Sequence, residues 1–369
     1  MAAVGGDEAH REFMRQALDL AERGWGRVQP NPLVGAVVVR AGEVVGVGWH
    51  AEHGGEHAEI AALRAAGAAA AGATLYVTLE PCAHTGKTPP CTDAIQRAGI
   101  ARVVYATEDP HAVAGGGARC LAEQGIDVLG GVERDAARTL NAPFFHAVEQ
   151  ESCFVALKLA VSLDAAIAPA PGARAQLTGS EAVADAHRWR AAADAIVVGA
   201  GTARVDDPLL TVRGDIAPRV VPVRVVLDSK LTLSPGSRLA RTARDAPLWL
   251  FASSQAPRDR ERCLESLGAR VTRVAVRDGM LDPLDVLGAL WDDGLRSVLC
   301  EGGARLAGSL LRERRVQRLI LYVAPVLFGA GAVPAFAGAA PEPADDWLPP
   351  TVLQLGPDVR FVLDRRSSA

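Results

Sequence analysis

Apolar positions along the first 150 residues alternate between helical and strand spacing. Residues 8–23 place apolar side chains at helical spacing and end before Gly24, which predicts a helix. Two β-rich runs, 33–40 and 43–49, flank Ala41-Gly42 and predict a hairpin. The other elements expected here are a helix over 58–71, a strand over 74–78, a loop over 80–91 that leads into a helix through Ile95, a strand over 102–106, a helix near 117–124 and a strand over 126–129. Together they predict one α/β unit.

The pattern lapses around 141–152, and a second alternation of strands and helices follows. Strands are expected over 154–161, 195–198, 223–227, 248–251, 271–274, 297–300 and 319–323, with helices near 180–192, 258–267, 283–291 and 304–313 between several of them. Strands that alternate with helices favour a mostly parallel sheet. Two final β-rich runs, 352–355 and 359–363, surround a Gly-Pro-Asp turn and predict a terminal hairpin. We therefore expect two domains, 1–150 and 151–369.

The composition excludes several classes of protein. A chain of 369 residues is too long for one ordinary core, and a hydrophobic content of 49% excludes a disordered chain. The uncharged stretch 319–341 is long enough to span a bilayer, but its three prolines predict a buried strand and a glycine-rich loop instead. Residues 1–10 contain two acidic side chains and no apolar core, so no signal peptide is expected. Six cysteines are too few for a secreted disulfide framework, which favours a soluble cytoplasmic protein.

The charge balance argues against nucleic acid as the partner. The formal net charge is −4, and residues 1–150 carry 12 basic against 18 acidic side chains. Binding to a duplex requires a basic face, which neither half of the chain provides. We expect a small-molecule substrate and no membrane or nucleic-acid partner.

The first candidate site combines His57-Ala58-Glu59 with Cys82 and Cys91. The histidine opens a predicted helix, and the cysteines lie in the loop after the next strand. One imidazole and two thiolates suit Zn²⁺ and leave a fourth position for water, whose pKa the metal lowers. Glu59 lies two residues beyond the histidine, where it can shuttle a proton from that water to a departing amine. This arrangement is the signature of the zinc deaminases.

Simpler interpretations exist for each fragment of this site. A lone His-x-Glu pair is usually exposed, and two cysteines can be buried thiols. A structural zinc protein is another alternative, but it needs four protein ligands, and the sequence offers only three. The other cysteines have no ligand-like spacing and are expected to serve packing: Cys120, Cys153, Cys263 and Cys300. The order and spacing of the whole set favour the catalytic zinc site.

Three runs of the first half, 30–35, 55–59 and 78–91, resemble the bifunctional riboflavin-biosynthesis deaminase/reductase family. The long loop between the two cysteines, with eight intervening residues, is that family's own variation. The resemblance implies a cytidine-deaminase-like domain followed by a dihydrofolate-reductase-like domain. It also implies zinc-dependent deamination of 2,5-diamino-6-(5-phosphoribosylamino)pyrimidin-4-one, and then NADPH reduction of the ribosyl group to ribityl.

The resemblance assigns substrate contacts in the first domain. Asn31 resembles a contact to the pyrimidine, and His50 lies beside the same pocket. His84, Lys87 and Thr88 resemble residues that bind the ribose phosphate, and together they can surround a dianion. Asp109 also matches the family pattern, whereas His111 replaces the asparagine that the family usually has.

The second half contains two glycine turns, 197–202 and 300–303, and each ends a predicted strand. The second turn precedes the helix expected near 304–313. Neither is a full dinucleotide fingerprint, and glycine turns are common wherever a chain bends. The runs 157–164 and 203–213, however, resemble the family's reductase domain. The resemblance gives Lys158 and Asp206 a catalytic role. It implies substrate contacts for Arg174, Arg190, Leu210, Arg213 and Glu301, and NADPH contacts for Ala160, Gln176, Thr202, Asp206, Ser229, Gly303, Ala304, Arg305, Leu306, Ala307, Gly308 and Ser309.

The second half also departs from the family pattern. Ala165 and Ala166 replace a glycine and a basic residue, Arg174 replaces a small hydroxyl residue, and Gln176 replaces an aromatic one. These departures keep open an alternative in which the protein is a deaminase only and a degenerate second domain serves binding or dimerisation. A homo-oligomer is expected in either case, because soluble enzymes of this kind often form closed symmetric assemblies.

Overall fold

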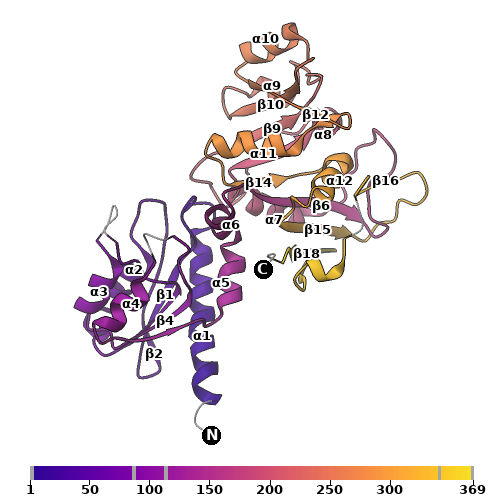
Figure 1. The fold of residues 1–369 in the computed structure, drawn as a ribbon. Helices are drawn as coiled ribbons and strands as arrows, with labels where there is room; N and C mark the ends of the chain where they lie inside the picture. The colour runs from indigo at the N-terminus through magenta and orange to yellow at the C-terminus, as the bar shows by residue number, and fades with distance from the viewer. Residues whose placement is uncertain (1–3, 85–88, 112–114, 340–341, 367–369) are drawn as a thin grey trace. The chain divides into compact units, whose positions relative to one another are not determined.

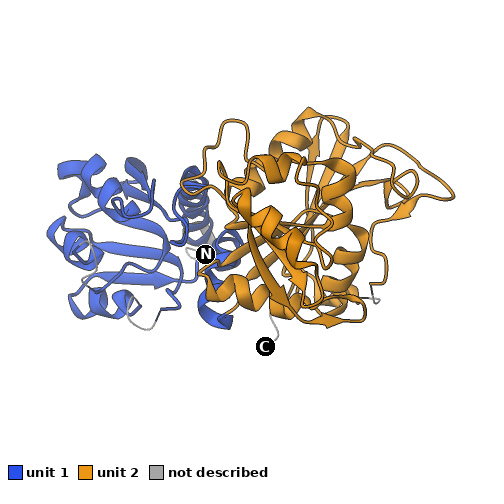
Figure 2. Cartoon of the chain, turned by 90° about the horizontal axis from the view of Figure 1, so that it is seen from above, with its two compact units in different colours: residues 1–151 blue, residues 152–369 orange. Residues whose placement is uncertain are grey.

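The computed structural model describes residues 4–84, 89–111, 115–339 and 342–366. Figure 1 shows the fold and the element labels used below. The chain divides into two compact units, unit 1 (residues 1–151) and unit 2 (152–369), coloured separately in Figure 2. In the part of the chain that the structure describes, no helix is long and apolar enough to cross a membrane.

Unit 1 is built on a five-stranded sheet in the order β2-β1-β3-β4-β5. The predicted hairpin is confirmed as β1 and β2, and β1 also pairs antiparallel with β3, whereas β3, β4 and β5 run parallel. The strands are β1 Gly35–Arg40, β2 Glu43–Trp49, β3 Thr74–Leu79, β4 Arg102–Thr107 and β5 Asp127–Gly130. The helices are α1 Val4–Ala21, α2 Ala58–Ala66, α3 Cys91–Arg97, α4 Gly117–Glu123, α5 Arg134–Leu140 and α6 Ala142–Gln150.

Helices α1 and α2 pack on opposite faces of β1. Successive side chains of a strand point to opposite faces, and Ala36 and Val38 accordingly join the core under α2, whereas Val37 and Val39 join the core under α1. Glycine permits this close approach, because a Cβ on Gly35 would lie 1.9 Å from the Ala17 carbonyl oxygen in α1. Close packing of α2 places the start of that helix, and with it His57, against the sheet.

The sequence pattern was wrong about residues 141–152, which it left without an element. They contain the whole of α6, which follows α5. Pro143 weakened the helical pattern, but it lies in the first turn of α6, where a proline's missing N–H is not needed. The helix expected over 58–71 also ends earlier, at Ala66, because Gly67 has a positive φ of 53°; residues 67–70 continue as a 3₁₀ turn.

Unit 2 contains a nine-stranded sheet in the order β11-β10-β9-β8-β14-β6-β15-β18-β17. The strands from β11 to β15 are parallel, and β18 and β17 form the predicted antiparallel terminal hairpin. The sheet strands are β6 Phe154–Ser162, β8 Ala195–Gly199, β9 Val223–Leu227, β10 Leu248–Ser253, β11 Arg270–Val274, β14 Ser297–Cys300, β15 Arg318–Ala324, β17 Thr351–Leu355 and β18 Asp358–Asp364. The helices are α7 Ser180–Ala191, α8 Ala200–Asp206, α9 Arg238–Arg241, α10 Arg258–Ser266, α11 Pro283–Asp292 and α12 Ala304–Arg312.

Short elements that the sequence pattern missed complete unit 2. These are the pairs β7 Ala166–Ala168 with β16 Val333–Pro334, and β12 Val276–Arg277 with β13 Met280–Leu281. The uncharged stretch 319–341 begins with a strand, as predicted, because residues 319–324 belong to β15. The described residues after it form a loop and β16.

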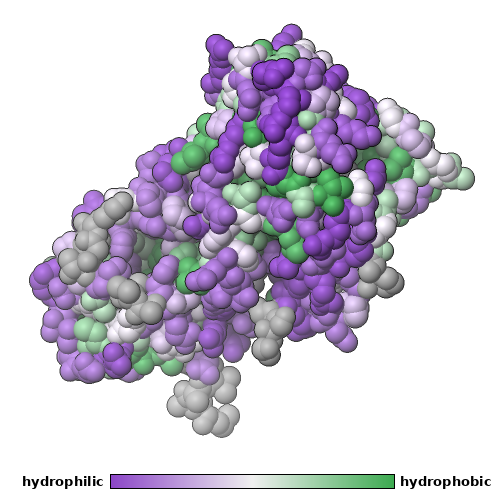
Figure 3. Space-filling model, turned by 45° about the horizontal axis from the view of Figure 1, so that its top comes forward, coloured by the Kyte–Doolittle hydropathy of each residue, from purple (hydrophilic) through white to green (hydrophobic). Residues whose placement is uncertain are grey.

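Each unit has its own hydrophobic core. In unit 2 one cluster lies around Leu157, Val298 and Leu310, and a second around Ile196, Val226 and Leu250. Polar side chains dominate the face of the molecule shown in Figure 3, and apolar residues appear there in smaller groups. The parallel strands place their carboxyl ends at one edge of the sheet, where α/β folds bind ligands. The glycine turns after β8 and β14, and Ser229 after β9, all lie at that edge.

Candidate active sites

The predicted zinc ligands His57, Cys82 and Cys91 come together in unit 1. His57 is the residue before α2, Cys82 follows β3, and Cys91 begins α3. His57 Nδ1 lies 3.2 Å from Cys91 Sγ and 3.7 Å from Cys82 Sγ, and the main-chain N–H of Cys91 donates to Cys82 Sγ at 3.4 Å. In the described part of the chain, these three residues form the group of side chains able to hold a metal.

The geometry of the three donor atoms fits zinc. Tetrahedral Zn²⁺ with bonds of about 2.0–2.3 Å separates neighbouring ligand atoms by roughly 3.6 Å. The observed nitrogen–sulfur separations lie on either side of that value. The hydrogen bond between the two thiols lowers the pKa of Cys82 and raises that of Cys91, so the two sulfur atoms hold one proton between them. A bound metal would displace that proton, because thiolates are the ligands that zinc takes. Three protein ligands, rather than four, match a catalytic site and not a structural one.

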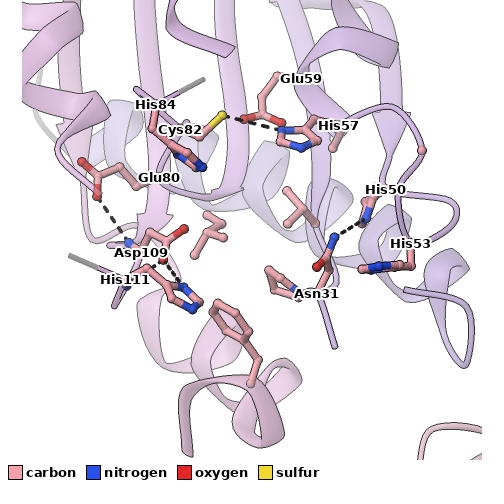
Figure 4. Close-up of a pocket in the computed structure, with 17 residues that line it drawn as sticks. Asn31, His50, His53, His57, Glu59, Glu80, Cys82, His84, Asp109 and His111 are labelled. Carbon is pink, nitrogen blue, oxygen red and sulfur yellow. Dashed lines mark hydrogen bonds and ion pairs between the residues drawn. The ribbon is translucent and has the colours of Figure 1, made fainter. Parts of the chain in front are cut away.

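Glu59 lies in the first turn of α2, next to the donor atoms. Its side chain is buried, with the residue only 4% exposed, and burial raises the pKa of its carboxyl group. Figure 4 shows Glu59, His57 and Cys82 together in one pocket of about 320 Å³. A buried carboxyl group with a raised pKa can both accept and return a proton.

The predicted substrate residues of unit 1 line the same pocket. Asn31 and His50 lie on one side of it and are joined by a contact of 3.2 Å between Asn31 Nδ2 and His50 Nε2 (Figure 4). His50 Nδ1 donates to the main-chain oxygen of Glu56, and burial lowers its pKa. His84 and Asp109 also line the pocket. Lys87 and Thr88 lie outside the described residues.

Sequence reasoning missed the role of Glu80 in this pocket. One oxygen of its buried carboxylate accepts the main-chain N–H groups of Gly116 and Ala118, at 3.1 and 2.9 Å, and the other accepts that of Asp109 at 3.3 Å. One side chain therefore ties together the two ends of the segment 109–118. The run 78–91 contains Glu80 two residues before Cys82. The hydrogen-bond partners of Glu80, however, are main-chain N–H groups, which the sequence pattern does not reveal.

His111 also lines the pocket, held by Asp109. Both its main-chain N–H and its Nδ1 contact Asp109 Oδ1, at 2.9 and 3.1 Å, and its ring lies 5.3 Å from that of Phe144 in α6. This contact with α6 shows that the helix missed in the sequence contributes to the pocket wall.

In unit 2 the structure brings Lys158, Arg190 and Glu301 together. Arg190 in α7 holds both carboxylate oxygens of Glu301, through Nε to Oε1 and through Nη2 to Oε2 at 2.6 Å, and donates to the Thr211 carbonyl at 3.0 Å. Burial alone raises the pKa of Glu301, but Arg190 and then Lys158 outweigh it and lower the pKa to about 2. Burial lowers the pKa of Lys158, whose Nζ lies 5.4 Å from the ring centre of Tyr322.

The glycine turns of unit 2 lie side by side. A Cβ on Gly303 would lie 3.4 Å from Thr202 Oγ1, so the turns after β8 and β14 meet. Gly303 has a φ of 88°, which only glycine adopts easily, and α12 starts at the next residue. Farther along α12, Ala307, Gly308 and Ser309 are buried, whereas Arg305 is exposed.

The remaining predicted residues of unit 2 have mixed surroundings. Asp206 ends α8; burial raises its pKa and the nearby Arg174 opposes that shift. Leu210 has a positive φ of 52° and its side chain belongs to a core cluster, so only its main chain is available to a ligand. Ala160 is half-buried in β6, Ser229 accepts hydrogen bonds from Ser253, and Arg213 and Gln176 are exposed.

Comparison with known proteins decides the family. The sequence profile of the RibD C-terminal domain matches residues 153–358, more than half of the chain. The chain belongs to the RibD family. A second profile, that of the cytidine and deoxycytidylate deaminase zinc-binding region, matches residues 7–107. These matches confirm the predicted fold class, a cytidine-deaminase-like domain followed by a dihydrofolate-reductase-like one, and identify an enzyme with a deaminase and a reductase domain.

Curated relatives from this family match the chain over most of its length. The riboflavin biosynthesis protein RibD of Bacillus amyloliquefaciens is 40% identical over 95% of this chain and 94% of its own, and that of Escherichia coli 38% over 87% and 89%. The solved Acinetobacter baumannii RibD, form 1, has a TM-score of 0.80 at 35% identity and covers 98% of this chain and 100% of its own. The diaminohydroxyphosphoribosylaminopyrimidine deaminase/5-amino-6-(5-phosphoribosylamino)uracil reductase of Thermotoga maritima has a TM-score of 0.82 at 33% identity, with the same coverage.

Proposed function

We propose that unit 1 deaminates 2,5-diamino-6-(5-phosphoribosylamino)pyrimidin-4-one with the help of zinc, and that unit 2 then reduces the ribosyl group of the product to ribityl with NADPH. The observation that carries the proposal is the convergence of His57, Cys82 and Cys91 beside the buried Glu59, in one pocket of substrate size. The name of the Thermotoga maritima relative, which specifies these two reactions, supports the choice of substrate.

The deamination replaces an amine of the pyrimidine by oxygen from water. Zinc, held by His57, Cys82 and Cys91, would make that water a better nucleophile. Glu59 takes a proton from the attacking water and delivers it to the amine, which leaves as ammonia. Asn31 and His50 hold the pyrimidine ring, and the phosphoribosyl group extends toward His84 and Asp109. Lys87 and Thr88 keep the phosphate-binding role that the family resemblance implies.

In the reduction, hydride is added to a carbon of the opened sugar, and a proton balances the product. NADPH supplies the hydride when it is bound. Lys158 holds a proton at Nζ, and Asp206 and Glu301 orient the sugar. Arg190 uses three of its five N–H groups within the protein, so two remain for the substrate phosphate beside Arg174, Arg213 and the main chain of Leu210.

We place the cofactor at the edge formed by the two glycine turns. The contact between Thr202 and Gly303 supports this placement, because a dinucleotide needs main-chain groups of neighbouring turns close together. In this turn Gly303, Arg305 and Leu306 are exposed or partly exposed and are the direct contacts that we propose, whereas the predicted residues Ala304, Ala307, Gly308 and Ser309 are buried beneath them. Ala160, Gln176 and Ser229 complete the proposed set.

The change Glu59→Gln tests the deaminase half. The amide keeps the shape of the side chain but cannot shuttle a proton, so ammonia release should fall by about 10²–10⁴-fold while zinc content stays equal to that of the unaltered protein. Metal analysis and an ammonia assay on the pyrimidine substrate measure the two quantities. Unchanged ammonia release would remove Glu59 from the mechanism.

Consumption of NADPH with the deaminated intermediate tests the reductase half. We expect oxidation of NADPH by the unaltered protein and its loss in Lys158→Met, which keeps the side-chain volume but carries no proton. If NADPH binds and no oxidation follows, unit 2 is the degenerate domain that the sequence departures at Ala165, Ala166, Arg174 and Gln176 left open.

We further propose a cytoplasmic location and a homo-oligomeric assembly. All six cysteines are unpaired, which is typical of a reducing compartment and supports the location. Light scattering on the purified protein tests the assembly: a mass of one chain would reject it.

A further inference from the structure

His187, to which the sequence analysis assigned no role, lies within the cluster of charged residues in unit 2. It is in α7, three residues before Arg190, so the two side chains share one face of the helix. The residue is only 7% exposed. The charged groups that act on its ring are Arg190, Arg213, Glu301 and Lys158.

One ring nitrogen of His187 holds the chain at Arg213. Nδ1 accepts the main-chain N–H of Arg213 at 3.1 Å. Burial, followed by the charges of Arg190 and Arg213, lowers the pKa of His187 to about 4, so the ring is neutral near pH 7. A neutral imidazole that accepts at Nδ1 carries its proton on Nε2, which is therefore a hydrogen-bond donor.

The other ring nitrogen has no protein partner. Among the described residues, Nε2 makes no hydrogen bond, and it does not belong to the fully buried atoms that lack a partner, so a ligand can reach it. Around the ring stand three cations and one carboxylate, and that carboxylate is already held at both oxygens by Arg190. A donor with no partner in surroundings of net positive charge suits an anion rather than a cation.

We propose that His187 is a further substrate-binding residue of the reductase site and that its Nε2–H donates to the phosphate of the phosphoribosyl substrate. Nδ1 at the same time fixes the main chain of Arg213, so that one imidazole both orders the segment and contacts the anion. This inference rests on the reductase function proposed for unit 2 and adds to it a residue that no family resemblance assigned.

Two substitutions separate the two ring nitrogens. In His187→Asn the side-chain oxygen replaces Nδ1 as acceptor, but no donor reaches the Nε2 position. In His187→Gln the amide N–H₂ reaches that position and Nδ1 has no substitute. A hydrogen bond to a charged group that is lost in His187→Asn should raise KM for the intermediate by about 10- to 100-fold and change kcat much less.

The dephosphorylated intermediate is the matched control. His187→Asn should weaken use of the phosphorylated compound and leave kcat/KM for the dephosphorylated one unchanged, whereas His187→Gln should recover part of the loss. The melting temperature of each variant and its turnover of the dephosphorylated compound report whether unit 2 is folded. An unchanged KM in folded His187→Asn, or an equal loss with both compounds, would overturn the assignment.

Calorimetry separates a failure of this inference from a failure of the proposed function. Titration of the phosphorylated intermediate into the unaltered protein and into His187→Asn measures affinity without turnover. If the unaltered protein oxidises no NADPH, the proposed reductase function fails, and a weaker affinity in His187→Asn still supports the phosphate contact. Equal affinities would reject the contact whether or not NADPH is oxidised.

Discussion

At the scale of single residues, the Glu301–Arg190 ion pair is the most demanding feature of unit 2. The side chains of Glu301 and Arg190 are only 8% and 14% exposed, so both charges have lost most of their hydration. Their mutual attraction offsets this desolvation cost only while both partners are present. Among the described residues of unit 1 no ion pair is buried to this degree, and the buried Glu59 lies beside the proposed metal ligands. The two sites therefore use buried carboxyl groups oppositely: the pKa of Glu59 is raised and that of Glu301 is lowered.

The pH dependence of stability follows from the lowered pKa of Glu301. The folded pKa of about 2 lies below the ordinary value of 4.5, so the pair's contribution is fully present above about pH 4.5 and is lost as pH falls toward 2. Glu301→Gln should cost about 3–5 kcal/mol at pH 7, because Arg190 is left buried without its partner. Chemical unfolding of both proteins at pH 7, 4.5 and 3 checks this. A difference in stability that stays constant across the three pH values would contradict the ion-pair account.

Individual residues were predictable where a motif carries the chemistry. His57, Glu59, Cys82 and Cys91 were identified from order and spacing, and the structure brings them together. Glu80 and His187 were not identified, because both bind main-chain N–H groups of distant segments. The sequence provides no pattern for such partners. A helical projection of 180–191 was the one available signal, since it places His187 beside Arg190.

At the scale of elements, the strands were predicted better than the helices. Runs of buried β-branched residues identified the strands of both sheets, including the terminal hairpin. Short helices such as α5, α6 and α8 were missed, because seven to nine residues give too few turns for a clear period and Pro143 obscured one of them. These helices matter for the sites: α6 supplies Phe144 to the deaminase pocket, and α8 carries Thr202 and Asp206.

Two helical glycines of unit 2 provide a matched test of element packing. A Cβ on Gly308 in α12 would lie 2.0 Å from the Ala337 carbonyl oxygen, whereas one on Gly288 in α11 would meet nothing within 4 Å. Gly308→Ala should therefore destabilise unit 2 by about 1–3 kcal/mol through overpacking. Gly288→Ala should stabilise it by about 0.5–1 kcal/mol, because alanine favours the helix. Calorimetric melting of the two variants measures both, and equal melting temperatures would show that α12 can shift away from the 337 segment.

At the scale of the whole molecule, the two units are separate compact bodies with separate chemistry. The profile of the deaminase region lies within residues 7–107 and that of the RibD C-terminal domain within 153–358, so neither crosses from one unit to the other. The sequence analysis expected two domains, 1–150 and 151–369, although the lapse in pattern that suggested the boundary contains the helix α6. The part of each predicted reductase residue that a ligand could reach, by contrast, depends on main-chain geometry. Leu210, for example, has a positive φ, which no pattern of side chains reveals.

Separate sites predict complementation between two inactive proteins. Glu59→Gln should fail to start the sequence of reactions, and Lys158→Met should stop after the first. A mixture of the two should form the reduced product, with a lag that shortens as total protein increases, because the intermediate must pass through solution. Product formation followed over time by chromatography measures this. If each protein is active in its intact half and the mixture still forms no product, the intermediate does not leave the enzyme.

The separate hydrophobic cores also govern how damage spreads. The buried cluster around Ala62 and Ile95 lies wholly within unit 1, and the one around Leu157 and Leu310 lies wholly within unit 2. We therefore expect a cavity beside Ile95 to loosen first the support of the proposed zinc ligands, because the cluster around Leu157 and Leu310 includes no residue of unit 1. Inherited variation that damages one core should consequently weaken one of the two proposed reactions more than the other.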